Sequence, residues 1–304
     1  MHLLLTTSHS FLCLDTDSGE FHPLDRGRGL YYGIAQHQNR LYVAARNRLV
    51  SSTVDPKEER GEILIFDPRL QPCGALRAPF PLRDMHEIAW HDDTLWITCS
   101  YNNMIACYHP HDESWERWFP LGEGSGNNEN TEEFCDTHHF NSFLLDDAQL
   151  WLVAHNRGAS ELLAFSPATR ALTQRIALGQ CAHNLWRENG ALFTCSSAEG
   201  KILGAHGLSI DTGGFPRGIV STENARYLGI SALAERQERD FTTGKIRIYD
   251  TNWHWQKDIE LPGEGLILDL KPLPNGFRPT RPQNEKTSMW STLTQWINPR
   301  RPAS

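Results

Sequence analysis

An all-β fold, a six-bladed β-propeller of four-stranded antiparallel blades, is the fold class that this sequence predicts. One strand pattern occurs six times: a run of alternating apolar residues ends in an aromatic or apolar residue, then a polar residue, then Pro, Gly or Thr. The copies lie 40 to 57 residues apart and are Leu14-Asp15-Thr16, Phe66-Asp67-Pro68, Tyr108-His109-Pro110, Phe165-Ser166-Pro167, Ala205-His206-Gly207 and Tyr249-Asp250-Thr251. That spacing is typical of one four-stranded blade per repeat and is too irregular for a helical solenoid.

Two further strands are predicted upstream of five of these copies. In chain order, short runs that alternate apolar and polar residues predict strands over residues 39–43, 92–97, 146–152, 188–193 and 223–228. Another strand begins about nine residues before most of them, at Tyr32, His86, His139, His183 and Arg217. In a propeller this first strand is the innermost one, so these residues are predicted to converge on the central axis.

The sixth inner strand is predicted near the C-terminus, over residues 266–270. The N-terminal segment supplies only two strands, at 3–6 and 11–14, before the second repeat begins. We therefore expect the two ends of the chain to share one blade, which would close the ring and cover the last exposed sheet edges.

Composition limits the classes of partner. The chain has 304 residues, 39% of them hydrophobic, and includes 10 Trp and 13 Phe, which is ample apolar material for packing blade against blade. Its formal net charge of -8 offers no basic field, so we expect neither nucleic acid nor a membrane as a partner. Seven cysteines without close paired spacing, and no basic apolar leader, favour a reducing compartment; a cytoplasmic location is the prediction.

Three polar insertions interrupt the repeat, at residues 46–61, 121–138 and 234–244. By the predicted register all three fall on the face that propellers commonly use for binding, where a protein partner could also dock. Residues 1–275 form the predicted propeller. Residues 276–304 are a C-terminal extension that packs on the propeller or is partly disordered, with Met289, Trp290, Leu293 and Trp296 forming a helix face or, as we prefer, a strap.

A histidine cluster at the axis is the main functional prediction. Tyr32, His86, His183 and Arg217 occupy one equivalent position in their repeats, and in the third repeat either His138 or His139 can take it. Three imidazoles from three blades, His86, His139 and His183, could hold a divalent metal, with Fe, Zn, Cu or Mn as candidates, and leave coordination positions open. The other interpretation is a metal-free polar site or a purely structural cluster.

Further candidates surround this cluster. We assign Arg217, Tyr32 and Glu87 to catalysis, with Arg217 pairing an anionic substrate group or else a carboxylate of the chain. Ligand binding is predicted for the polar residues on the inner strands and at the loop mouths, namely Asn141, Asn184, Asp269, Tyr101 and His155. Glu87, Asn141 and Asn184 could instead orient the imidazoles or point into the blade interfaces. Asp269 beside the imidazoles would favour iron or manganese.

The strand endings Phe66-Asp67-Pro68 and Tyr249-Asp250-Thr251 and the entry Pro216-Arg217-Gly218-Ile219 resemble the broad superfamily of NHL, gluconolactonase/regucalcin and streptogramin-lyase propellers, over nearly residues 1–275. The chain is also similar to bacterial propeller proteins of this size. Gluconolactonases bind a divalent metal through Glu, Asn and Asp at the axis, but this chain has Tyr32-Gly33-Ile34 in place of their Glu-Gly-Pro entry, which argues against lactonase chemistry. Streptogramin-type lyases and carotenoid oxygenases have axial histidines in seven-bladed rings, so they are analogies.

Two hypotheses for function follow. The first is a metal-dependent enzyme, a hydrolase, lyase or oxygenase, that acts on a small, anionic molecule at the axis. The second is a non-catalytic propeller that binds a ligand or a protein on the same face.

Overall fold

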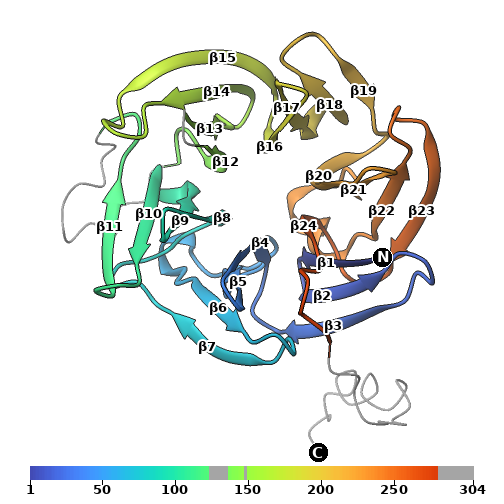
Figure 1. Cartoon of the computed structure of the whole chain (residues 1–304), viewed down its shortest axis with the longest axis horizontal. Coiled ribbons are helices and arrows are strands. Elements are labelled where there is room, and N and C mark those ends of the chain that lie inside the picture. Colours follow the sequence, from blue (N-terminus) through green and yellow to red (C-terminus); the bar gives the residue numbers. More distant parts are fainter. Residues whose placement is uncertain (123–135, 147–148, 280–304) are drawn as a thin grey trace, which may run out of the picture.

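The computed structural model of the chain describes residues 1–122, 136–146 and 149–279, which form six four-stranded sheets arranged in a ring (Figure 1). Every pairing between neighbouring strands is antiparallel, and the inner strands surround a central axis. The predicted six-bladed propeller is confirmed.

From the axis outward, the first three blades contain the following strands. The closing blade consists of β24 (Ile267–Pro272), β1 (His2–Thr7), β2 (Ser10–Asp15) and β3 (Phe21–Arg26). The next consists of β4 (Tyr31–His37), β5 (Arg40–Ala45), β6 (Glu62–Phe66) and β7 (Pro72–Leu76). The third consists of β8 (Met85–His91), β9 (Thr94–Cys99), β10 (Met104–His109) and β11 (Ser114–Trp118).

The remaining blades follow the same plan. The fourth consists of β12 (Phe140–Leu145), β13 (Leu150–Ala154), β14 (Ala159–Phe165) and β15 (Leu172–Gln180). The fifth consists of β16 (Ala182–Glu188), β17 (Ala191–Ser196), β18 (Lys201–Gly204) and β19 (Ser209–Asp211). The sixth consists of β20 (Phe215–Ser221), β21 (Arg226–Ser231), β22 (Gly244–Tyr249) and β23 (Trp255–Leu261).

The ring closes by pairing strands from the two ends of the chain. β1 lies beside β24, with Leu5 opposite Leu270 and Thr6 opposite Asp269. Just beyond the pairing, the buried carboxylate of Glu264 accepts hydrogen bonds from the hydroxyls of Thr7 and Ser10. The predicted sharing of one blade by the two ends is therefore present, and β24 begins one residue later than the sequence pattern suggested.

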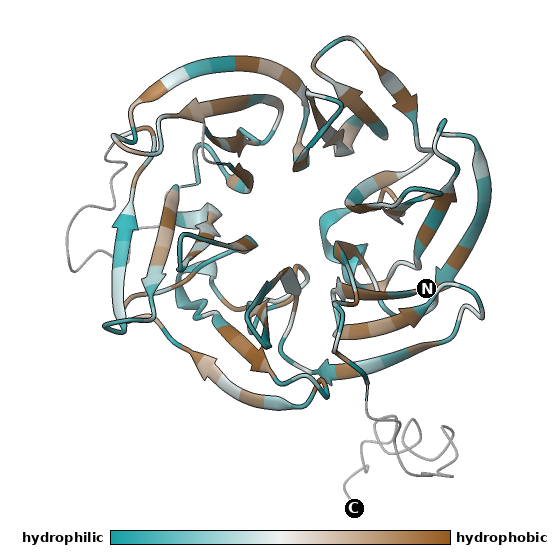
Figure 2. Cartoon of the chain, in the orientation of Figure 1, coloured by the Kyte–Doolittle hydropathy of each residue, from teal (hydrophilic) through white to brown (hydrophobic). Residues whose placement is uncertain are grey.

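Apolar side chains fill the space between neighbouring blades. Phe11 of the closing blade and Phe66 of the next one are both fully buried, with ring centroids 5.0 Å apart. In Figure 2 hydrophobic residues concentrate on the inner and middle strands, whereas the outer strands β11 and β23 are largely hydrophilic. The packing interface thus repeats around the ring and lies between blades, as strands buried on both faces require.

The register of the inner strand shifts at a similar level in every blade. In β8 the shift lies between Met85 and Ile88, in β16 between His183 and Leu185, and corresponding irregularities occur in β12, β20, β4 and at the pairing of β1 with β24. Such bulges leave residues outside the ladder and turn their side chains to new directions. They mark the end of each inner strand where the predicted site residues lie.

Two of the three predicted insertions meet on one face of the ring. The loop that contains the short 3₁₀ helix η1 (Pro56–Glu58) and the loop that contains η4 (Arg236–Phe241) are joined where the Ser51 backbone N–H donates to the carboxylate of Asp240, at 2.7 Å. The third insertion lies largely outside the described residues.

The C-terminal extension is described only at its start. Phe277 is buried against the first two blades, and the Arg278 backbone N–H donates to the Pro68 carbonyl at 2.9 Å. The strap or helix predicted around Met289, Trp290, Leu293 and Trp296 falls outside the described residues. Among the described residues no helix is long and apolar enough to cross a membrane, and the six cysteines that they include are all unpaired.

Close approach of inner strands gives the first testable prediction. A Cβ added at Gly33 in β4 would lie 2.5 Å from the Ile88 backbone nitrogen and 2.8 Å from the Glu87 Cα of the next blade. Because backbone atoms cannot move aside, Gly33→Ala is expected to destabilise the fold by about 1–3 kcal/mol. The measurement is the urea unfolding midpoint. Gly74→Ala in β7 is the control, since its new methyl would meet only Ile65 Cδ1 at 3.8 Å; equal effects of the two changes would contradict the prediction.

Candidate functional site

A cavity of about 350 Å³ opens at the axis on the face that carries the two described insertions. Its wall combines side chains from the starts of inner strands with side chains from both loops. Its lining includes Tyr32, Arg46, Asp84, His86, Tyr101, His139, His155, Arg157, Phe215, Arg217, Arg236 and Arg239. The cavity is therefore built by several blades at once, as the sequence repeat predicted for the axis.

Four histidine rings form a quadrilateral at the axis; those of His86, His139 and His155 line the cavity, whereas His183 is not in its lining. The ring centroids of His86 and His139 are 5.0 Å apart, those of His139 and His155 are 4.7 Å apart, and those of His155 and His183 are 4.9 Å apart. His183 closes the figure at 5.9 Å from His86. Of the two candidates in the third repeat, His139 faces the cavity, whereas His138 stacks on Phe140.

A serine fixes the tautomer of His86 and of His183. The Ser100 hydroxyl lies 2.9 Å from His86 Nδ1 and donates its proton to the Phe140 carbonyl of the next blade, at 2.6 Å. Because that hydroxyl has a single proton, Nδ1 of His86 must carry hydrogen and donate to it.

The same arrangement recurs two blades further on. Ser197 lies 2.9 Å from His183 Nδ1 and donates to the Pro216 carbonyl at 2.7 Å. In both histidines the lone pair is therefore left on Nε2. The buried Nε2 of His183 has no hydrogen-bond partner among the described residues.

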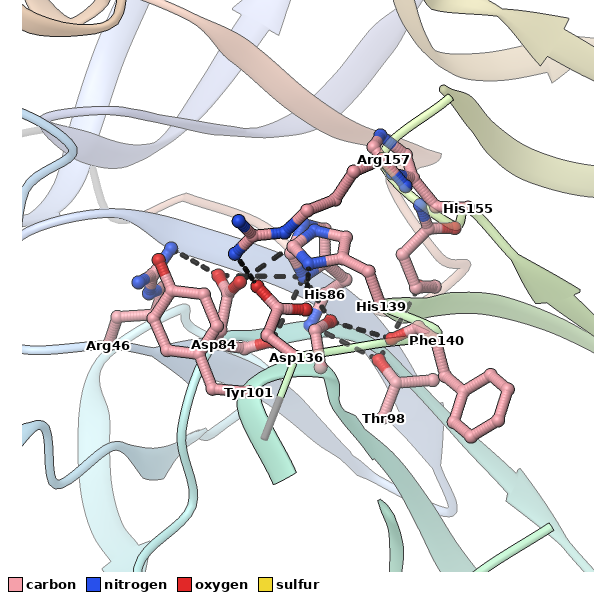
Figure 3. A network of polar contacts seen from close by, with 12 residues as sticks. Arg46, Asp84, His86, Thr98, Tyr101, Asp136, His139, Phe140, His155 and Arg157 are labelled. Atoms are coloured by element: carbon pink, nitrogen blue, oxygen red, sulfur yellow. Dashed lines mark hydrogen bonds and ion pairs between the residues drawn. The ribbon is translucent and has the colours of Figure 1, made fainter. Parts of the chain in front are cut away.

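Hydrogen bonds also fix the tautomers of the other two histidines, but these two differ in which ring nitrogen carries the hydrogen. His139 Nδ1 lies 2.7 Å from the Asp136 carboxylate, to which it donates, so the lone pair of neutral His139 is also on Nε2 (Figure 3). His155 Nδ1 instead accepts from the Arg157 backbone N–H at 3.0 Å, so neutral His155 carries its hydrogen on Nε2. Three imidazoles thus present acceptors and the fourth presents a donor.

Burial keeps three of these imidazoles neutral. The pKa of His86 and that of His183 lie well below the usual range, first because burial disfavours the cation and then because of positive neighbours, which include Arg217. Burial, His139 and Arg217 lower the pKa of His155 to about 2. Neutral imidazole is the form that binds a metal ion or accepts a hydrogen bond, so protonation does not compete near neutral pH.

The sequence reasoning missed Asp84, which lies beside the histidines. This buried carboxylate pairs with Arg46, and its oxygens are 3.7 Å from His86 Nδ1 and 3.8 Å from His139 Nε2. Arg46 also holds Glu59 with two hydrogen bonds, at 2.8 and 2.6 Å (Figure 3 shows Arg46 beside Asp84). The only signal in the sequence was an acidic residue two positions before His86. In the structure this residue lies at a turn, where its backbone is left-handed with φ of 51°.

Asp84, His86 and His139 form a group that could hold a metal ion. One potential ligand atom from each lies within 4.8 Å of the others. The donor set fits a divalent transition metal: two imidazoles and a carboxylate suit Fe, Mn or Zn and leave positions open. Compared with the predicted trio, the structure brings His86 and His139 together with Asp84, and His183 does not belong to this group although its ring lies 5.9 Å from that of His86.

The two tyrosines predicted for the site line the cavity. The Tyr32 ring lies 4.4 Å from the His86 ring, and the Tyr101 ring lies 6.3 Å from the His139 ring. The Arg46 guanidinium lies over both tyrosines, at 5.7 and 5.3 Å. The aromatic wall thus holds Arg46 in place from both sides.

Four other predicted residues lie elsewhere on the inner strands. Asn141 Nδ2 donates to the Ala182 carbonyl at 2.7 Å, and Asn184 Oδ1 accepts from the Gly218 N–H at 2.6 Å, so both join neighbouring blades. Asp269 accepts from the Ile34 N–H at 3.0 Å.

Glu87 is the fourth of these residues. Its carboxylate lies 3.8 Å from the Lys271 ammonium group. The β4 blade separates the blades of these two residues, so the pair meets inside the ring of inner strands. None of these four residues is among those that line the cavity.

Comparisons with known proteins support the fold and no closer relationship. No known protein family and no curated protein matches the sequence. Among solved structures, the chain is similar to one in a nidogen/laminin complex, with 11% identity, a TM-score of 0.62, and coverage of 88% of this chain and 97% of that one. A Bacteroides caccae protein of unknown function gives 11% identity, a TM-score of 0.61 and the same coverage. At this identity the likeness shows the propeller fold alone.

The position of Glu87 predicts a pH dependence of stability. Burial raises its pKa to about 7, and Asp269 adds to that rise while Lys271 opposes it. A carboxyl whose pKa is higher in the folded state contributes stability at acidic pH that is lost as pH rises from its usual value near 4.5 through about 7. Glu87→Gln should remove this loss, so its stability relative to wild type should increase between pH 4.5 and 8 by up to about 3 kcal/mol.

The measurement is the urea unfolding free energy of both proteins across that pH range. Glu113→Gln, at an exposed turn, is the control and should follow wild type at every pH. A constant difference between Glu87→Gln and wild type would contradict the prediction.

Proposed function

We propose that this propeller is a metal-dependent enzyme that acts on a small anionic molecule in the axial cavity. In this proposal Asp84, His86 and His139 hold a divalent ion, and Arg217 pairs with an anionic group of the substrate. The observation that carries it is the approach of three potential ligand atoms to within 4.8 Å of one another, at the base of a cavity large enough for a small molecule.

The surroundings of the three ligands support the proposal. Asp136 accepts from His139 Nδ1, so His139 offers Nε2, which lies 3.8 Å from an Asp84 oxygen. His86 Nδ1 lies 2.9 Å from both the Ser100 hydroxyl and the Asp84 backbone carbonyl, so the lone pair of His86 is on Nε2. Carboxylates and hydroxyls in this position are the usual outer partners of metal-binding histidines, because they fix the tautomer and raise the basicity of the ligand nitrogen. Arg46 holds Asp84 in the same way from its other side.

The rest of the wall offers groups for positioning a substrate. When bound, a divalent ion supplies Lewis-acid activation for hydrolase or lyase chemistry, and iron would add oxygenase chemistry. His155 lines the cavity and presents an Nε2–H donor, so the wall could orient a substrate group through that hydrogen bond. Tyr32 borders His86, and Arg217 lies at the start of β20 with a largely buried charge.

A metal-free binding protein is the second candidate, and the ion pair between Arg46 and Asp84 favours it. That pair already compensates the carboxylate, so the cavity could bind an anion without an added cation. Such a propeller would be a non-catalytic ligand-binding scaffold.

Metal binding by purified variants separates the two candidates. The protein is stripped with a chelator, reloaded separately with iron(II) under anaerobic conditions, manganese and zinc, and analysed for bound metal. His139→Asn, which removes one ligand, should lower metal affinity by at least about 100-fold, and Asp136→Asn, which leaves the ligands but removes the outer partner, by about 10- to 100-fold. His254→Asn, at an exposed turn, is the control and should bind as wild type does.

A graded loss of metal in the order Asp136→Asn and then His139→Asn supports the enzyme proposal, and the metal bound most tightly selects the substrates to screen. Background metal in wild type with every ion, or equal binding by wild type and His139→Asn in folded protein, would overturn it in favour of the metal-free binding protein. Unfolding midpoints of each variant show that the fold is retained.

A further inference from the structure

Three arginines line the cavity and differ in how deeply their side chains are buried. Arg236 is exposed on the η4 loop, Arg239 is half-buried on the same loop, and Arg217 is 7% exposed at the start of β20. All three line the cavity, and none has a carboxylate partner among the described residues, in contrast to Arg46 and Arg157. Unpaired cations in a concave wall focus an attractive potential for anions.

Phe215 brings two of these guanidinium groups together. Arg217 lies 4.9 Å and Arg239 5.9 Å from the centroid of the Phe215 ring. Arg239 is further fixed by a hydrogen bond from Nε to the Ala234 carbonyl at 3.1 Å, and Arg236 donates to the Tyr101 hydroxyl at 3.0 Å. The loop and the inner strand thus place three planar guanidinium groups in the cavity wall, two beside Phe215 and one at Tyr101.

The buried arginine is unfavourable for stability as the chain stands. Arg217 Nε is buried with no hydrogen-bond partner among the described residues. A buried N–H without a hydrogen-bond partner is unfavourable, and an anionic ligand in the cavity could accept from it. Crowding of like charges adds to this cost: the pKa of Arg239 is lowered by burial and then by Arg217 and Arg236.

Positively charged side chains outnumber negatively charged ones around the cavity. Among the described residues five guanidinium groups, those of Arg46, Arg157, Arg217, Arg236 and Arg239, line the cavity or pair within its wall with three carboxylates, those of Glu59, Asp84 and Asp136. Among these guanidinium and carboxylate groups, two positive charges remain uncompensated. A divalent ion would increase this excess.

We propose that Arg217, Arg239 and Arg236 form a subsite for a dianionic part of the substrate, either the phosphate of a phosphate monoester or the two carboxylates of a short dicarboxylate. The inference rests on the proposed function in that it places this dianionic part in the same cavity as Asp84, His86 and His139. Planar guanidinium groups bind such oxygens with paired hydrogen bonds, and two negative charges neutralise the excess. The substrate class is therefore a small dianion.

Anion binding by chelator-treated protein tests the subsite without the metal. The full chain is titrated calorimetrically with inorganic phosphate, succinate and acetate at constant ionic strength. We expect phosphate or succinate to bind at least about 10-fold more tightly than acetate, and Arg217→Met to weaken that binding by about 10- to 100-fold, the effect of losing a charged hydrogen bond. Whichever dianion binds more tightly identifies phosphate esters or dicarboxylates as the class.

Two further variants keep the test decisive. Arg117→Met is the matched control, because Arg117 lies over Phe80 at 5.3 Å in the same type of contact but outside the cavity. Arg239→Met, which changes a half-buried side chain on the η4 loop, should weaken dianion binding by at least about 3-fold. It replaces Arg217→Met in the test if that variant does not fold.

Equal binding of acetate and the dianions, or dianion binding unchanged in the folded arginine variants, would overturn the subsite. If metal binds but dianions do not, the subsite fails and the proposed enzyme stands. If dianions bind but metal does not, the subsite stands and the enzyme proposal fails.

Discussion

The inner strands of this propeller all lose their regular pairing at the same end, and the cavity depends on that shared irregularity. The shift lies between Met85 and Ile88 in β8 and between His183 and Leu185 in β16, with counterparts in the other four blades. A regular strand would alternate its side chains between the two faces of the blade, where neighbouring blades cover them. The bulge in β8 takes His86 out of the ladder, and His183 is the last paired residue before the bulge in β16. At this level the two rings meet, with centroids 5.9 Å apart.

The same irregularity explains how far the sequence could predict the site. The spacing of repeats identified the six blades, the shared closing blade and the level of the axial histidines, because periodic apolar residues determine which strand packs where. It could not determine where Glu87, Asn141 and Asn184 point, since period-two reasoning fails within a bulge. In the structure the two asparagines bind backbone groups of the next blade, and Glu87 reaches Lys271 inside the ring.

A second physical reason explains why the sequence did not predict Asp84 and Asp136 as site residues. Asp84 lies in a left-handed turn and Asp136 in an insertion, and neither position belongs to the strand period. Arg46, at the end of β5, meets Asp84 only because the following loop turns back and brings Glu59 to the same guanidinium. Contacts of this kind depend on how long loops close over a rigid ring, and hydrophobic periodicity carries no information about them.

The cavity combines two electrostatic demands that one residue helps to meet. Burial alone lowers the pKa of His86, His155 and His183, and the charge of Arg217 lowers each of them further. In the proposed subsite Arg217 would bind the anion, and its charge also favours the neutral imidazoles that a metal or a hydrogen-bonded substrate would require. If a dianion occupied the arginines, part of this effect would be cancelled. Burial would then have to hold the tautomers in place together with the hydrogen bonds that His86 and His183 donate to Ser100 and Ser197 and the one that His155 accepts from the Arg157 backbone. Each of these bonds is made by Nδ1, whereas the lone pairs of His86 and His183 and the N–H donor of His155 are on Nε2. Which imidazoles offer a donor and which an acceptor therefore does not depend on whether the anion is bound.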